Sequence, residues 1–235
     1  MDAGINCYDS TDDIFDSLAK AKVDAMSGQY SNHWDVFDES FFTKLRNSND
    51  LHDFRRSGLS KWLDDSNVES DEKKIASYFH TLVKTVGSEF YNKVAEPKIG
   101  KPSVFNVNDV VVDFNDLFLI NFAFQIMPYV PCNAHPIIVE IGAGYGGLGV
   151  KLKKLFPLAT IILLDLPEVN AIQHHYVKRN FNEAKILHFA NWKKTHEKLD
   201  RVNISLYDFV ILPGWLIEKL FDYSVDVVIN TRSMM

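Results

Sequence analysis

Residues 139–149 read Val-Glu-Ile-Gly-Ala-Gly-Tyr-Gly-Gly-Leu-Gly, and this stretch decides the fold. An apolar run ends in the carboxylate of Glu140 and passes into a turn with glycines at alternate positions. Further along the chain, residues 161–165 form a second apolar run that ends in Asp165. This order is typical of a parallel strand–helix–strand unit that holds a nucleoside-containing cofactor over its glycine turn.

The glycine turn by itself leaves the cofactor open. Gly142, Gly144 and Gly146 let the chain turn sharply and bring backbone N–H groups close to a ligand. Gly147 completes a G-x-G-x-x-G spacing, so the dinucleotide fingerprint is satisfied as well. Glycines at these positions can also serve close packing of a helix against a strand.

The charges around the turn favour S-adenosylmethionine over a dinucleotide such as NAD. Glu140 would repel a pyrophosphate, whereas it would stabilise the ammonium and sulfonium groups of S-adenosylmethionine. Residues 142–149 contain no Arg or Lys to meet phosphates. Asp165 suits the ribose hydroxyls of either cofactor, and it can also cap a helix that begins at Pro167.

Hydrophobic periodicity predicts an α/β fold: a Rossmann-like sheet preceded by a mainly α-helical region. Strands are expected over 137–141, 160–165, 208–212 and 225–230, with a short extra strand within 185–190. Helices are expected between them, over 146–156, 167–180 and 214–221.

The predicted domain division places the helical region in residues 1–130 and the cofactor-binding domain in residues 131–235. In the first part, apolar residues at helical spacing predict helices within 34–63, over 71–94 and over 116–129. Residues 103–112 are expected to form a short strand or hairpin, and the polar residues 1–30 to be loosely ordered.

The composition excludes several classes of protein. The chain has 235 residues, of which 46% are hydrophobic, and its net charge of −6 gives no general attraction to nucleic acid. The clustered Lys151, Lys153 and Lys154 are interpreted as a solvated helix face. Cys7 and Cys132 form no redox or metal motif, and no apolar stretch is long enough to span a bilayer. We expect a cytoplasmic protein without disulfides.

Three segments together carry a family resemblance. Residues 140–147 resemble motif I of the class I S-adenosylmethionine-dependent methyltransferases. Residues 164–169, Leu-Asp-Leu-Pro-Glu-Val, with Gln173 after them, and residues 224–234 narrow the match: they look like the sugar O-methyltransferases of bacterial surface-polysaccharide gene clusters. Segments 49–62 and 99–102 resemble the upstream part of that family, so the resemblance extends over residues 33–235.

The resemblance implies methyl transfer from S-adenosylmethionine to a sugar hydroxyl in polysaccharide biosynthesis. Glu140 and the glycines would line the methionine part of the cofactor. Asp165 and Leu166 would hold its ribose and adenine, and Trp215 would lie near the adenine base. The residues that it implies at the cofactor are Glu140, Gly142, Ala143, Gly144, Tyr145, Gly146, Asp165, Leu166, Leu212, Pro213 and Asn230.

The end of the chain departs from the family. The family's sheet is similar to a seven-stranded one, whereas this chain ends five residues after Asn230. We therefore expect a truncated form with about four parallel strands. An unpaired fourth strand favours self-association into a homo-oligomer.

The catalytic base is not identified by the sequence. Methyl transfer to a hydroxyl commonly uses a general base, and His174 and His175 are candidates because they follow Asp165 on a helix. More distant candidates are His33, His52, His80, His135, His188 and His196. No metal site is expected. Two other hypotheses stay open: a non-catalytic remnant that binds the cofactor or another chain, and an NAD-dependent oxidoreductase.

Overall fold

A computed structural model of the chain describes residues 51–56, 71–95, 99–132, 135–195 and 198–231. The predictions for residues 1–30 and for most of the helical segment 34–63 lie outside these residues, as do the candidate bases His33 and His196.

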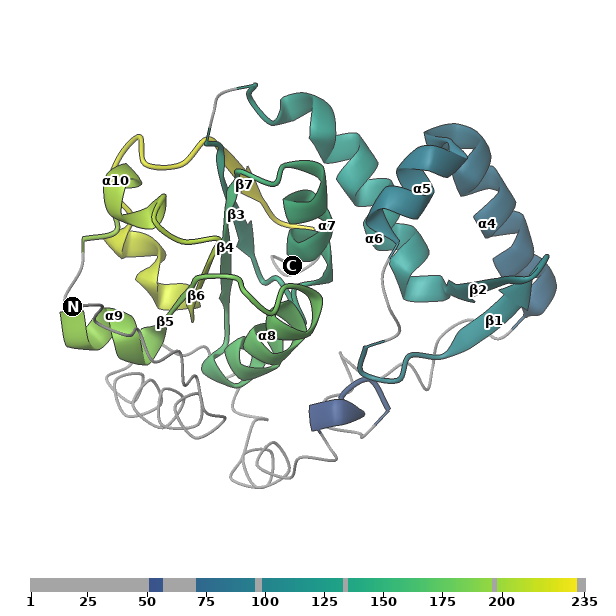
Figure 1. Ribbon diagram of the computed structural model, residues 1–235, viewed down its shortest axis with the longest axis horizontal. Helices are drawn as coiled ribbons and strands as arrows, with labels where there is room; N and C mark the ends of the chain where they lie inside the picture. Colours follow the sequence, from purple (N-terminus) through teal and green to yellow (C-terminus); the bar gives the residue numbers. More distant parts are fainter. Residues whose placement is uncertain (1–50, 57–70, 96–98, 133–134, 196–197, 232–235) are drawn as a thin grey trace, which may run out of the picture.

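The described part of the chain contains a five-stranded parallel sheet with the order β5-β6-β4-β3-β7 (Figure 1). This confirms the predicted α/β fold. The fifth strand, β5, comes from the segment 185–190. The strands are β3 (Ile137–Ile141), β4 (Thr160–Asp165), β5 (Ile186–His188), β6 (Phe209–Pro213) and β7 (Val227–Ile229).

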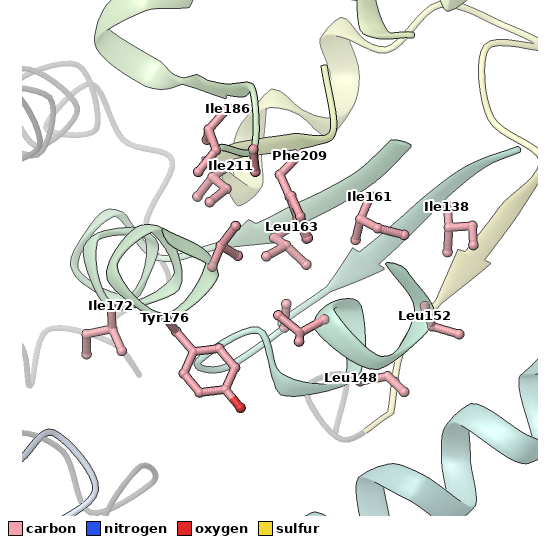
Figure 2. Close-up of a cluster of buried hydrophobic side chains, with 14 of the residues drawn as sticks. Ile138, Leu148, Leu152, Ile161, Leu163, Ile172, Tyr176, Ile186, Phe209 and Ile211 are labelled. Atoms are coloured by element: carbon pink, nitrogen blue, oxygen red, sulfur yellow. The ribbon is translucent and has the colours of Figure 1, made fainter. Parts of the chain in front are cut away.

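Helices cover both faces of the sheet. On one face, α7 (Gly147–Leu155) and α8 (Pro167–Asn180) pack against Ile138, Ile161 and Leu163, as Figure 2 shows. On the other face lie α9 (Phe189–Thr195), α10 (Arg201–Ile204) and the 3₁₀ helix η4 (Gly214–Lys219). The segment 214–221 was predicted as an α-helix, but it forms only the tighter 3₁₀ turns that are common in short connections.

The N-terminal elements form a further layer beside α7 (Figure 1). The helix predicted over 71–94 is broken into α4 (Glu72–Val86) and α5 (Ser88–Val94), because Gly87 has φ +86° and ψ +148°, which no α-helix accommodates. Asp71 caps α4 by accepting hydrogen bonds from the N–H groups of Lys73 and Lys74. α6 (Phe114–Ile126) and the 3₁₀ helix η3 (Met127–Tyr129) confirm the helix predicted over 116–129.

The predicted short strand or hairpin is an antiparallel pair, β1 (Val104–Val107) and β2 (Val110–Asp113). Asn108 and Asp109 make its two-residue turn with φ values of +48° and +64°. Positive φ at both central residues is the requirement of a type I′ turn, which Asn and Asp tolerate better than most residues.

Lys151 and Lys153 of the lysine cluster on α7 are buried, so the interpretation of the cluster as a solvated face was wrong for these two residues. Lys151 is fully buried and forms an ion pair with Asp116 of α6. Lys153 donates to the Ala159 carbonyl and to Asp208, both at 2.7 Å. Carboxylates and carbonyls take the place of water around these buried lysine side chains.

The first turn of α6 carries a second buried ion pair. Arg55 donates to both carboxylate oxygens of Asp113, at 2.5 and 3.0 Å. Asp113 is also the N-cap of α6, where its side chain accepts from the N–H groups of Asn115 and Asp116. This carboxylate therefore fixes residues 51–56 to the start of α6.

The domain boundary at residue 130 stays a prediction. It falls between η3 and β3, yet one hydrophobic cluster contains Ala123 and Val130 together with Ile138 and Leu148. Among the described residues, no helix has both the length and the apolar character needed to cross a membrane.

Replacing Lys151 with Met should lower the free energy of unfolding by about 3–5 kcal/mol, because it leaves the Asp116 carboxylate buried without its cation. The double variant K151M/D116N, which removes both charges, should recover a large part of this loss. Urea unfolding followed by circular dichroism measures both values.

Lys219→Met, at an exposed position of η4, is the matched control. If K151M loses no more stability than K219M, the ion pair does not hold α6 against α7.

Candidate functional site

The glycine turn follows directly from the end of β3. The N–H of Gly142 donates to the Leu164 carbonyl at 2.7 Å, so the turn begins as a continuation of the β3–β4 ladder. The N–H of Gly146 then donates to the Ala143 carbonyl at 3.0 Å and closes a four-residue turn. Within it, Gly144 has φ +54°, a left-handed conformation that glycine adopts without strain.

Two side chains hold the peptide groups of Gly144. Its N–H donates to Oδ2 of Asp165, at the end of β4, with a distance of 2.8 Å. Its carbonyl accepts from Nε2 of Gln173 on α8, also at 2.8 Å. Gln173 is held in turn by Asn170, whose Nδ2 donates to Oε1 of Gln173 at 2.9 Å.

The glycines of the loop serve two different purposes. A Cβ placed on Gly144 would meet none of the described atoms within 4 Å beyond its chain neighbours, so this residue faces open space. A Cβ on Gly147 would lie 2.6 Å from Leu119, and one on Gly149 would lie 2.7 Å from Leu163. Gly147 and Gly149 therefore allow close packing, whereas Gly144 leaves room above the turn.

Glu140 lies behind the turn, with only 2% of its surface exposed. Burial and, to a smaller extent, the nearby Asp165 carboxyl raise its pKa to about 8, while the N–H of Gly149 acts in the opposite direction. Its Oε2 atom has no hydrogen-bond partner in the described part of the chain. Such an orphaned buried acceptor fits a neighbouring N–H, O–H or positive charge, and it does not fit a phosphate.

Asp165 is partly buried, and both of its oxygens accept backbone hydrogen bonds: Oδ2 from Gly144 and Oδ1 from Leu166, each at 2.8 Å. Burial raises the pKa of Asp165 to about 7, although the two amide donors lower it. Asp165 does not cap α8, whose N-cap residue is Leu166 without a side-chain hydrogen bond. Each carboxylate oxygen accepts more than one hydrogen bond, so Asp165 retains capacity for ligand hydroxyls.

The sheet order places this loop at a topological switch point. The chain runs from β3 to β4 on one side of β3, whereas it crosses from β6 to β7 on the other side, so the strand order reverses at β3. Ligands of open parallel sheets bind outside the carboxyl ends of the strands at such a point. The structure thus brings the glycine turn, Asp165 and Asn230 to one edge.

The remaining predicted residues lie at the ends of neighbouring strands. Leu212 and Pro213 pair in register with Leu164 and Asp165, but the Leu212 side chain is fully buried in the core. Asn230 follows β7 and its Nδ2 donates to the Ile141 carbonyl at 3.1 Å, which ties β7 to the start of the glycine turn.

Tyr145 turns its ring towards the helical region. Its ring lies 4.9 Å from that of Tyr176 and 5.7 Å from that of Phe54, measured between centroids, and the Arg55 guanidinium lies 5.1 Å from its centre. Residues 51–56 therefore pack onto the glycine turn. Phe54 and Arg55 were not predicted at the site, because nothing local in their sequence indicates a partner so far along the chain.

Neither leading histidine candidate has the surroundings of a base at this edge. His174 is buried, with its ring 5.9 Å from that of His188. His175 packs against His52 at 5.5 Å, and burial, followed by the positive charges around it, lowers its pKa to about 4. His80 bonds Asn108, and His135 contacts the Leu158 carbonyl.

Within the described residues, no group of three or more His, Cys, Asp or Glu side chains could hold a metal ion.

A scan against protein-family models finds no match, and a search of curated proteins finds none either. Among solved structures, the chain is similar to a coclaurine N-methyltransferase bound to N-methylheliamine and SAH, with 12% identity and a TM-score of 0.24. The match covers 73% of this chain and 44% of that enzyme, so the chain spans less than half of that enzyme's length. At this identity and score the likeness decides nothing about function.

The free energy of unfolding of the parent chain should fall as the pH rises, and replacing Glu140 with Gln should reduce this fall. Between its ordinary pKa of 4.5 and its pKa of about 8 in the folded chain, Glu140 keeps a proton that the unfolded chain has released. The free energy of unfolding therefore falls as the pH rises through this range. E140Q should be more stable than the parent chain at pH 8.5, and the difference should shrink towards pH 5.

Thermal or urea unfolding at a series of pH values measures this difference. Asp165 contributes in the same direction up to about pH 7, whereas His175 acts in the opposite direction below pH 6.5. The interval from pH 7 to 8.5 is therefore the most informative. The exposed Glu218 gives the control variant E218Q; equal pH profiles for E140Q and E218Q would contradict the assignment.

Proposed function

We propose that the chain binds S-adenosylmethionine at the carboxyl edge of the sheet, above the turn of residues 142–146. The observation that carries this proposal is the hydrogen bond from the Gly144 N–H to Asp165, together with the open space next to the Cα of Gly144. It puts a carboxylate whose chemistry suits ribose hydroxyls next to a turn whose backbone a ligand can approach closely.

The charges at this edge support S-adenosylmethionine over NAD. The carboxyls of Glu140, Asp165 and Glu168 influence one another there, and residues 142–149 contain no cation for a pyrophosphate. The nearest lysine in the sequence, Lys151, is buried against Asp116. A ligand with an ammonium and a sulfonium gains by favouring the ionised forms of these carboxyls, whereas a dianionic ligand is repelled by those forms.

In the proposed complex, the glycine turn and Glu140 would hold the methionine part, and Asp165 and Leu166 the ribose and adenine. Leu212, Pro213 and Asn230 would close the site from β6 and β7. The cofactor supplies the methyl group. The contribution of the chain is to bind and orient it and to exclude water.

We further propose methyl transfer to a sugar hydroxyl, as the sequence resemblance in residues 140–147, 164–173 and 224–234 implies. A non-catalytic cofactor-binding chain is the alternative, and the surroundings of His174 and His175 favour it, because neither residue is placed as a base at the cofactor edge. Methyl transfer to sugar acceptors, followed with a labelled methyl group, separates the two.

Isothermal titration calorimetry with S-adenosylmethionine, S-adenosylhomocysteine and NAD tests the cofactor. We expect the first two to bind and NAD not to bind. Gly144→Ala should weaken S-adenosylhomocysteine binding more than about ten-fold, because its Cβ occupies the space above the turn.

The matched control is Gly87→Ala. Gly87 also has a positive φ, and a Cβ placed on it also meets nothing within 4 Å, but it lies between α4 and α5. Both variants strain a backbone with positive φ, and the strain is at least as large in G87A because Gly87 combines φ +86° with ψ +148°, so only G144A should lose affinity. Binding of NAD alone, or equal affinity losses in both variants, would overturn the proposed site.

Self-association through β7 is a separate proposal. In the sheet formed by the described residues, β7 is the edge strand next to β3, and 61% of Val228 is exposed on it. An apolar edge strand offers backbone hydrogen bonds to a second copy. Sedimentation velocity should show an oligomer that Val228→Lys shifts to monomer; a monomeric parent chain would reject the idea.

A further inference from the structure

A buried chain of polar side chains connects α8 to the glycine turn. Asn170 donates to Gln173 at 2.9 Å, and Gln173 donates to the carbonyl of Gly144 at 2.8 Å. Gln173 is fully buried and Asn170 is 9% exposed. The two residues are three positions apart, so they lie on one face of the helix.

Gln173 occupies a position at which burial alone favours an apolar side chain. Its helix neighbours Ile172, Tyr176 and Val177 all belong to the hydrophobic cluster between α8 and the sheet. A buried amide is tolerated only when its donor and acceptor both have partners. Here Nε2 has the Gly144 carbonyl and Oε1 has Asn170, so both ends of the amide are bonded.

The glycine turn rests on this side chain. A Cβ placed on Gly146 would lie 3.7 Å from Cγ of Gln173, so the stem of the side chain packs under the turn while its amide bonds Gly144. Together with the Asp165 bond, the closing bond from Gly146 to Ala143 and the bond from Gly142 to the Leu164 carbonyl, the turn has four hydrogen-bond anchors among the described residues. Two of these lie on Gly144 itself, where the absence of a Cβ leaves the backbone more freedom than other residue types have.

We infer that Gln173, itself oriented by Asn170, is a positioning residue: it keeps the Gly144 turn ordered before a ligand arrives and thereby sets the affinity for the cofactor. Gln173 acts on the ligand only through the turn, and its link to affinity rests on the proposed function. Without the bond from Gln173 to Gly144, part of the binding free energy of the ligand would be used to order the turn.

Gln173→Leu tests this inference because it keeps the approximate volume and removes the donor to Gly144. In the ligand-free chain, mass-spectrometric hydrogen exchange should become about ten-fold faster for residues 142–146, the amount expected for the loss of one buried hydrogen bond. The amides of β3 and β4 should keep their rates. Titration with S-adenosylhomocysteine should show about ten-fold weaker binding.

Val177→Ala is the matched control, one turn further along α8. Val177 is fully buried in the same cluster, and its apolar side chain cannot form a hydrogen bond with Gly144, so its truncation lowers stability in the same helix without removing a bond to the turn. Exchange of residues 142–146 and cofactor affinity should both stay within about two-fold of the parent chain.

The outcomes separate the inference from the proposed function. Unchanged exchange of residues 142–146 in Q173L overturns the inference, and so does faster exchange with unchanged affinity. A parent chain that does not bind S-adenosylhomocysteine overturns the proposed function. In that case the exchange comparison of Q173L with V177A still decides whether Gln173 holds the turn.

Discussion

The hydrogen bond from the Gly144 N–H to the Asp165 carboxylate is the constraint on which the site depends. It joins the loop after the first strand of the sheet to the end of the next strand along the chain, across 2.8 Å. The parallel register of β3 and β4 brings these two residues together, and the packing of Gly149 lets α7 start close to the sheet. A shift of one residue in that register would separate donor from acceptor.

The acidic carboxyl edge of the sheet restricts the kind of ligand that the site favours. Burial makes the proton on Glu140 hard to remove near neutral pH, so the ligand-free edge avoids a concentration of unpaired negative charge. A positively charged ligand would favour the ionised forms of Glu140 and Asp165. A phosphate would find neither a cation nor a free donor side chain from residues 142–149.

Much of the sheet was predictable because its signals are local. Apolar runs end in Glu140 and Asp165, and the glycines between them mark the turn, so the strands and their order of appearance could be read from short windows. The burial of charged and polar side chains could not be predicted in this way, because it depends on partner residues that are distant in the sequence. Lys151 reads as a surface residue until Asp116 of α6 is placed beside it, and Gln173 reads as an ordinary helix residue until the turn lies above it. The break at Gly87 could be predicted only in part. The sequence shows a glycine within the helical pattern, but only its backbone angles in the structure show that it separates α4 from α5.

The bond between Arg55 and Asp113 has a consequence for how the chain is made. Residues 51–56 leave the ribosome before several groups that hold them in the described part of the chain: Asp113 is 58 positions after Arg55, and Tyr145 and Tyr176 come later still. The segment therefore has no defined place until α6 and the first strand–helix unit of the sheet have emerged. Docking of an early segment onto a late one is a slow, non-local step. Residues 51–56, which pack onto the glycine turn, are thus synthesised before the turn but reach their final place after it has formed.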